Sequence, residues 1–74
     1  MAKRPRHPDK DIEAAVKYAE ANGWIWTPSG GHAWGVLWCP LGQRGGCRFG
    51  VWSTPRNPYS HARFIRRQVD RCPH

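Results

Sequence analysis

One histidine of this chain stands where it could carry a proton. His32 follows two glycines, Gly30 and Gly31, and opens a strand-like run from Ala33 to Cys39. An imidazole titrates near neutral pH, so it can accept the proton of a ribose 2′-hydroxyl or donate one to the leaving oxygen during RNA cleavage. The glycines let a nucleic-acid backbone approach closely. We predict His32 as a catalytic residue; the alternative is a polar residue at a strand start without a chemical role.

Basic residues predict a polyanionic partner. Twelve Lys and Arg stand against five Asp and Glu, for a formal net charge of +7. The positive electrostatic potential of so small a domain attracts nucleic acid or the acidic face of a protein. The alternative is a basic chain that is merely soluble. Arginine holds phosphate through paired hydrogen bonds, and the candidate RNA-binding residues are Arg48, Arg63, Arg66 and Arg67. His61 is a candidate second proton carrier.

Three cysteines and the last histidine form a candidate metal site: Cys39, Cys47, Cys72 and His74. The strand that follows Cys47 spans about 20 Å, and so does the helix that returns to Cys72. These equal lengths predict that the side chains meet at one end of the domain. Three thiolates and an imidazole are an ordinary structural zinc set, and zinc would stabilise a core this small.

Other arrangements of these residues remain open at this point. The cysteines could be buried and reduced, or Cys39 and Cys47 could form a disulfide. Another histidine could also replace His74 as the fourth ligand: His7 or His61.

Two helices are predicted, one toward each end of the chain. The first is capped by Asp9 or Asp11 and continues to about Asn22, where Gly23 ends it in a left-handed conformation. Its apolar stripe consists of Ile12, Ala15, Val16 and Ala19. The second is capped by Asn57, with Pro58 in its first turn. Its buried stripe consists of Ala62, Ile65, Val69 and Cys72.

Three short runs of strand-forming residues between the helices predict an antiparallel meander over 24–27, 33–39 and 47–52. The order α-β-β-β-α indicates an α+β fold in which both helices cover one face of a three-stranded antiparallel sheet. We predict one domain over 9–74, preceded by a flexible basic arm over 1–8.

The predicted sheet has an apolar face and a tryptophan-rich face. Side chains alternate along a strand, and the face assigned to the core carries Ile25, Leu37, Phe49 and Val51. The open face then carries Trp24, Trp26, Trp34, Val36, Trp38 and Trp52. Arg48 shares the open face, which is the reason for this assignment, and Trp24 is expected to be buried beside the helix end. An exposed apolar patch favours a protein interface over base stacking, although a shift of one residue in register would reverse the two faces.

The chain contains no apolar run long enough to cross a bilayer, and no apolar segment behind its basic N-terminus that would make a signal peptide. The odd number of cysteines argues against a secreted disulfide framework. We therefore expect a cytoplasmic protein that does not associate with membranes.

The helix that ends at Asn22-Gly23-Trp24, the Gly30-Gly31-His32 turn before the second strand and the closing basic helix resemble the HicA-type toxins of bacterial toxin–antitoxin pairs. The resemblance covers about residues 10–72. It implies a double-stranded-RNA-binding-domain-like fold, cleavage of mRNA without a catalytic metal, and neutralisation by a HicB-like antitoxin protein. It also implies that His32 is the catalytic residue.

Two other functions remain open from the sequence. One is a non-catalytic RNA-binding or protein-interaction module on the same fold, with zinc as a staple. The other is a small zinc protein whose tryptophan face docks on a larger protein, a reading favoured by the three cysteines and five tryptophans.

Overall fold

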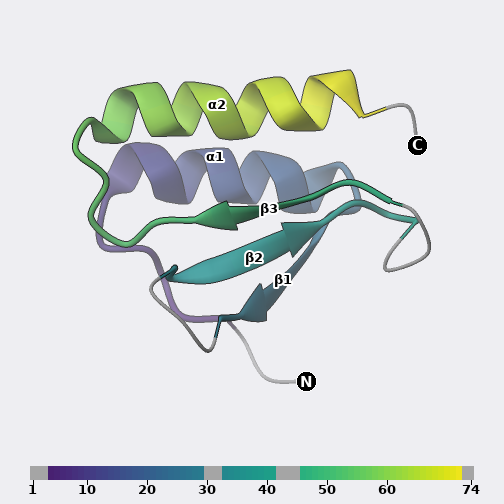
Figure 1. Ribbon diagram of the computed structural model, residues 1–74, viewed down its shortest axis with the longest axis horizontal. Helices are drawn as coiled ribbons and strands as arrows, with labels where there is room; N and C mark the ends of the chain where they lie inside the picture. Colours follow the sequence, from purple (N-terminus) through teal and green to yellow (C-terminus); the bar gives the residue numbers. More distant parts are fainter. Residues whose placement is uncertain (1–3, 30–32, 42–45, 73–74) are drawn as a thin grey trace.

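The computed structural model confirms the predicted α+β class and order of elements. It describes residues 4–29, 33–41 and 46–72. The elements are α1 (Lys10–Ala21), β1 (Ile25–Pro28), β2 (Gly35–Trp38), β3 (Arg48–Val51) and α2 (Pro58–Arg71). The strands form an antiparallel sheet in the order β1-β2-β3. The two helices lie side by side on one face of this sheet (Figure 1). Neither helix is long and apolar enough to cross a membrane, and the described part of the chain holds no other.

The helix ends follow the capping residues of the sequence. The Asp9 carboxylate accepts hydrogen bonds from the backbone N–H groups of Asp11 and Ile12, so Asp9 caps α1 and Asp11 belongs to its first turn. Asn57 caps α2 by accepting the N–H of Ser60. Gly23 follows α1 with a φ of +89°, which a residue with a side chain rarely adopts. These contacts fix where both helices begin and where the first ends.

The core lies between the helix pair and the sheet. The predicted stripe of α1 is fully buried, and Ala62, Ile65 and Val69 of α2 pack with it. Leu37 and Val51 close the core from the sheet side, and neither is exposed to solvent. Phe49 extends this layer by packing its ring against those of Trp24 and Phe64.

The predicted face of β1 is wrong. Ile25 pairs with Trp38, and Trp26 pairs with Leu37, so β1 is shifted by one residue from the register that would put Ile25 beside Leu37. A one-residue shift turns each side chain to the opposite face. Ile25 is therefore 57% exposed, whereas Trp26 packs against the core.

The tryptophan-rich open face is consequently much smaller than predicted. Trp24 is buried, as expected, and Trp26 lies on the same side of the sheet. Trp34 packs against Trp26 and the His7 ring. The open face keeps Trp38, whose indole N–H donates to the Thr27 hydroxyl.

The sharpest steric constraint on the Trp26 side chain is Gly35. A Cβ at position 35 would lie 2.0 Å from Trp26 Nε1. Only glycine leaves room for the indole to cross β2 there. This close approach explains why Trp26, and not Ile25, occupies the helix side of β1.

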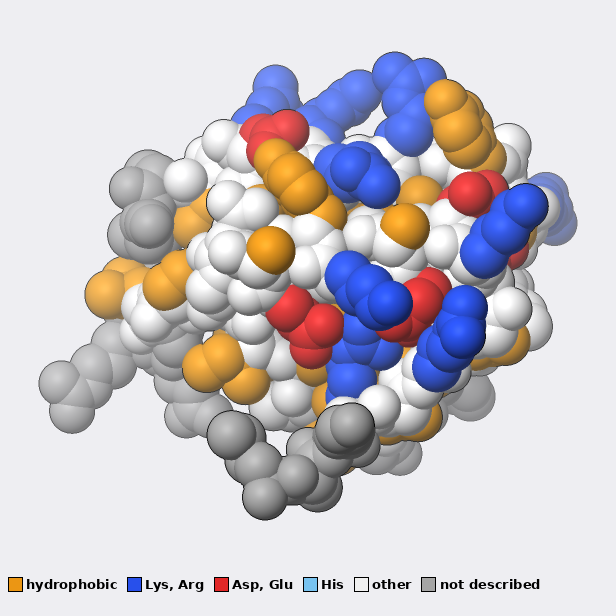
Figure 2. Space-filling model, turned by 180° about the vertical axis from the view of Figure 1, so that it is seen from behind, with side chains coloured by type: hydrophobic (Ala, Val, Ile, Leu, Met, Phe, Trp, Pro, Cys, Tyr) orange, Lys and Arg blue, Asp and Glu red, His pale blue; other side chains and the backbone are white. Residues whose placement is uncertain are grey.

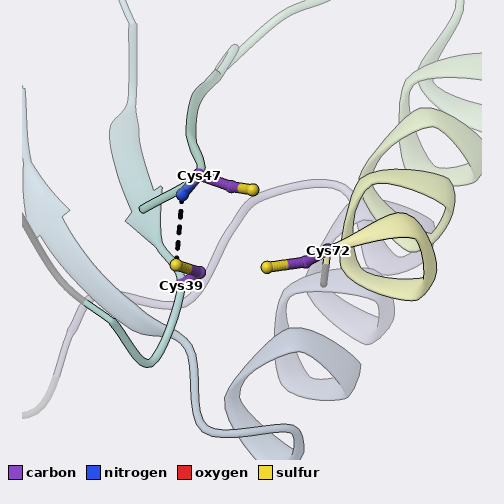
Figure 3. A group of neighbouring side chains, drawn as sticks. All are labelled: Cys39, Cys47 and Cys72. Atoms are coloured by element: carbon purple, nitrogen blue, oxygen red, sulfur yellow. Dashed lines mark hydrogen bonds between the residues drawn. The ribbon is translucent and has the colours of Figure 1, made fainter. Parts of the chain in front are cut away.

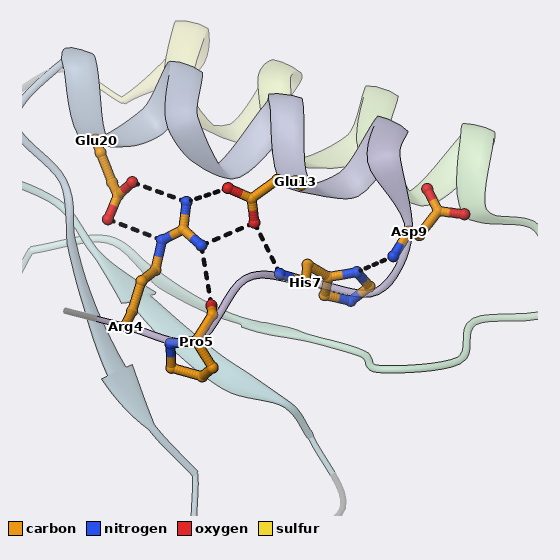
Figure 4. Close-up of polar contacts among 6 residues, drawn as sticks. All are labelled: Arg4, Pro5, His7, Asp9, Glu13 and Glu20. Carbon is orange, nitrogen blue, oxygen red and sulfur yellow. Dashed lines mark hydrogen bonds and ion pairs between the residues drawn. The ribbon is translucent and has the colours of Figure 1, made fainter.

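The N-terminal segment packs on the domain, and Arg4 and His7 of the predicted flexible arm over 1–8 contact α1. Arg4 donates two hydrogen bonds of 2.8 Å to Glu13 and two of 3.0 Å to Glu20, both on α1 (Figure 4). The backbone N–H of His7 donates to the same Glu13 carboxylate at 2.8 Å. Because Glu13 is only 5% exposed, this segment supplies the partners that a buried carboxylate requires. Residues 1–3 lie outside the described part of the chain.

His7 and His61 hold the two polar groups of the Trp52 backbone. His7 Nδ1 accepts the N–H of Asp9 at 3.0 Å, so its Nε2 carries the proton and donates to the Trp52 carbonyl at 2.8 Å. His61 Nε2 accepts the Trp52 N–H at 3.2 Å. Burial and, next, the neighbouring His7 lower the pKa of His61. Both histidines therefore have a structural role, because they hold the backbone on either side of the Trp52 Cα.

Replacing Glu13 with Gln is expected to lower the free energy of unfolding by about 2 kcal/mol at pH 7, because a charge-assisted contact is lost. The Arg4 guanidinium, supported by the His7 N–H, lowers the pKa of Glu13 from 4.5 to about 2. The folded state thus binds this proton less tightly than the unfolded state, and the stabilisation is complete above pH 4.5 and disappears as pH falls toward 2. Urea unfolding followed by tryptophan fluorescence at pH 7 and pH 3 measures the difference.

Glu20→Gln is the matched control, since the Glu20 side chain is 37% exposed and its ion pair is screened by water. We expect it to lose less stability than Glu13→Gln. A Glu13→Gln penalty that is as large at pH 3 as at pH 7 would contradict the electrostatic origin of the effect.

Candidate metal centre and basic surface

Three cysteine side chains converge where the β2–β3 hairpin meets the end of α2 (Figure 3). The Sγ atoms of Cys39, Cys47 and Cys72 all lie within 4.8 Å of one another. None of the three is in a disulfide. The structure thus confirms that these cysteines are close enough to hold a metal ion.

Strand alternation and helix length bring the three side chains together. Cys39 is two residues beyond the buried Leu37, and Cys47 is two residues before Phe49, so both point to the helix side of the sheet. Cys72 is the C-cap residue of α2, and its N–H donates to the Val69 carbonyl at 3.3 Å. The equal reach of β3 and α2 therefore carries Cys72 back to the hairpin as predicted.

Two hydrogen bonds join Cys39 and Cys47, and one of them reaches the Cys39 sulfur. The Cys39 N–H donates to the Cys47 carbonyl at 2.9 Å, and the Cys47 N–H donates to Cys39 Sγ at 3.1 Å. An N–H donor directed at sulfur favours the thiolate, which is the metal-binding form. Hydrogen bonding with Cys72 is the main cause that raises the pKa of the Cys47 thiol, with further contributions from burial and Cys39.

The alternative histidine ligands are not near this site. His61 and His7 both bind the Trp52 backbone, beyond the opposite end of β3. His61 also precedes Cys72 by eleven residues of α2, or about 16 Å along the helix axis. The prediction that either histidine replaces His74 is therefore wrong. His74 itself lies outside the described residues.

A basic surface covers the side of α2 that faces away from the core. Arg63, Arg66 and Arg67 are all exposed. Viewed from behind, Lys and Arg side chains gather along the upper edge of the molecule, where α2 lies (Figure 2). Arg63 and Arg67 line two adjacent hollows on α2, one with Ser60 and Phe64. Arg66 borders the second hollow, together with Asp70 and Arg71.

Aromatic side chains orient two of these arginines. The Arg63 guanidinium lies 6.0 Å from the ring centre of Tyr59, one helical turn earlier. Arg66 lies 5.3 Å from the ring of Tyr18 on α1, and the Tyr18 hydroxyl donates a short hydrogen bond to Asp70. The i, i+4 spacing of Tyr59 and Arg63 is a signal that sequence reasoning missed. The contact of Tyr18 with Arg66 joins two helices, so no short-range sequence pattern predicts it.

Arg48 does not belong to this surface. It lies on the open face of the sheet, opposite Trp38, and its guanidinium is 5.5 Å from the Trp38 ring centre. Ile25 pairs with Trp38 on the other side. The four predicted RNA-binding arginines are therefore divided between two faces, three on α2 and one on the sheet.

The predicted catalytic histidine cannot be placed. His32, with Gly30 and Gly31, lies outside the described residues. The candidate second proton carrier, His61, is half-buried, and its Nε2 accepts a hydrogen bond from the Trp52 N–H. The geometry therefore favours a structural role for His61 over proton transfer.

Comparisons of sequence and fold with known proteins found no match. No protein-family model matches it, no curated protein is significantly similar in sequence, and no solved structure is significantly similar in fold.

Proposed function

We propose that this protein binds RNA through the arginine face of α2. The observation that carries the proposal is the side-by-side placement of Arg63, Arg66 and Arg67 around two hollows on one exposed helix face. Guanidinium groups that share a hollow can hold one phosphate from two sides. Phosphate contacts of this kind provide most of the affinity of a basic protein for nucleic acid.

The balance of charge supports the same surface. Two of the five acidic residues, Glu13 and Glu20, are paired with Arg4 on the N-terminal segment. Asp9 caps α1. Most carboxylates therefore lie away from α2, whose four arginines face one aspartate, Asp70, and give this helix a net positive charge.

The proposed fold is of the double-stranded-RNA-binding-domain-like type. The order α-β-β-β-α, with both helices on one face of an antiparallel sheet, agrees with that architecture. Domains of this type recognise an RNA duplex mostly by its shape and its phosphates, which requires basic side chains on a rigid element and little base readout. A helix fixed along one face, with arginines outward, meets that requirement.

Replacing Arg63 and Arg67 together with Ala is expected to weaken binding to an RNA duplex by at least tenfold at low salt. Each lost phosphate contact also lowers the slope of log affinity against log salt concentration by roughly 0.7–0.9. Fluorescence anisotropy titrations at several salt concentrations measure both quantities. The double variant is expected to stay folded, because both side chains are exposed.

Arg48→Ala is the matched control, since this arginine also stacks on an aromatic ring but lies on the opposite side of the sheet. We expect a smaller loss of affinity and a nearly unchanged salt slope. A larger effect at Arg48 would move the RNA interface to the open face of the sheet and refute the assignment to α2.

A second candidate function adds cleavage to binding. In it the protein is a ribonuclease toxin of the HicA type, with His32 as general acid or base and an antitoxin of the HicB type as its protein partner. The order of elements that the resemblance implies is the order found, and this supports the candidate. The metal that Cys39, Cys47 and Cys72 can hold is structural in this proposal and takes no part in cleavage.

His32→Ala is expected to relieve growth arrest on expression while the protein stays folded by circular dichroism, because no other group would replace the imidazole in proton transfer. Purified His32→Ala should leave an mRNA intact that the unaltered protein degrades, and should still bind it. Equal toxicity of the two proteins, or RNA that stays intact with both, would leave the non-catalytic RNA-binding function as the one supported.

A further inference from the structure

We propose that Cys39, Cys47 and Cys72 bind one zinc ion as thiolates, and that this ion fastens α2 to the β2–β3 hairpin. Three independent parts of the chain supply the sulfurs: the residue after β2, the residue before β3 and the C-cap of α2. The three Sγ atoms lie within 4.8 Å of one another.

The spacing of the sulfurs suits a tetrahedral ion. A Zn–S bond of about 2.3 Å separates two sulfurs of a tetrahedral site by about 3.8 Å. Side-chain rotations alone can therefore bring the three sulfurs onto one ion, without movement of the strands or of α2. The Cys47 N–H already points at Cys39 Sγ, as expected for a sulfur that carries negative charge.

The number and type of donors favour zinc over other sulfur chemistry. A disulfide would join two cysteines and leave the third buried or half-buried beside it. An iron–sulfur cluster of the all-cysteine type needs four thiolates, and the chain has three cysteines. Three thiolates are the larger part of the donor set of a structural zinc site, which a fourth ligand closes.

Zinc would set the position of the arginine face, a step that rests on the proposed RNA-binding function. Cys72 ends the helix that carries Arg63 and Arg67, and the ion would tie that end to the sheet. Removal of zinc is therefore expected to free the end of α2 and to weaken RNA binding by several-fold.

Metal quantification on freshly purified, reduced, unchelated protein tests the site directly. We expect one zinc per chain by mass spectrometry of the elements, and a native mass that falls by one zinc on chelation. Cobalt(II) added to the apoprotein should give the strong visible bands of a tetrahedral thiolate site. Less than a tenth of an equivalent of zinc, or stoichiometric iron or copper in its place, overturns the proposal.

Cysteine variants assign the ligands. Cys72→Ser is expected to lose the cobalt bands or to shift them strongly, and Ser60→Ala, an exposed change near the start of α2, should leave them intact. Cys47→Ser keeps the other two thiolates and should lower zinc affinity at least tenfold in a chelator competition. An unchanged affinity overturns Cys47 as a ligand. Zinc binding by the unaltered chain does not depend on whether any of these variants folds.

RNA titrations with the zinc-loaded and apo forms separate the two proposals. Stoichiometric zinc without RNA binding refutes the proposed function and leaves the metal site standing. RNA binding by a chain that takes up no zinc even when zinc is supplied refutes the metal site and leaves the proposed function standing. Equal RNA affinity of the loaded and apo forms refutes the coupling between them.

Discussion

The attachment of α2 at the two ends of β3 is the constraint on which the other features depend. Beyond one end, His61 accepts the Trp52 N–H, while His7 receives the carbonyl of the same residue. Before the other end, Cys72 approaches Cys47 and Cys39. Between these points α2 contributes Ala62, Ile65 and Val69 to the core that it shares with the sheet, and the Phe64 ring contacts Phe49 edge-on. A chain of this size buries too little apolar surface for packing alone to hold a helix firmly, so the polar contacts at its ends matter more than in a larger domain.

The orientation of α2 about its own axis determines which residues can reach a ligand. Ile65 and Val69 must face α1, because both are buried in the shared core. Helical periodicity then directs Arg63 and Arg67 outward. Tyr18 reinforces this orientation from α1 through its contacts with Arg66 and Asp70. The basic surface is thus a consequence of core packing, and a change in the docking of α2 would move the arginines as one group.

Local signals in the sequence predicted most of the fold. The helix stripes, the caps at Asp9 and Asn57 and the stop at Gly23 depend on neighbours within one turn, and the structure confirms each. The face of β1 could not be obtained in this way, because Ile25 and Trp26 are both apolar and alternation fits either register. What decides it is the fit of Trp26 over Gly35, a contact between strands.

The two polar sites differ in how far the sequence could reveal them. The cysteine cluster was predictable, because the rise per residue of a strand and of a helix fixes the return of Cys72 to the hairpin. The role of Arg4 was not, since its partners Glu13 and Glu20 follow nine and sixteen residues later and the segment around it has the composition of a mobile arm. Its commitment to α1 becomes visible only when the buried position of Glu13 is known.

The cysteines occupy positions where this fold would otherwise need apolar side chains. Cys39 is fully buried and Cys47 lies on the helix side of the sheet, yet a thiol fills less volume than the Leu or Val found elsewhere in the core. The proposed zinc ion would cross-link the chain at this end of the domain and so reduce the entropy of the unfolded state. It would also make the position of α2 depend on the state of three sulfur atoms, which a leucine at the same position could not do.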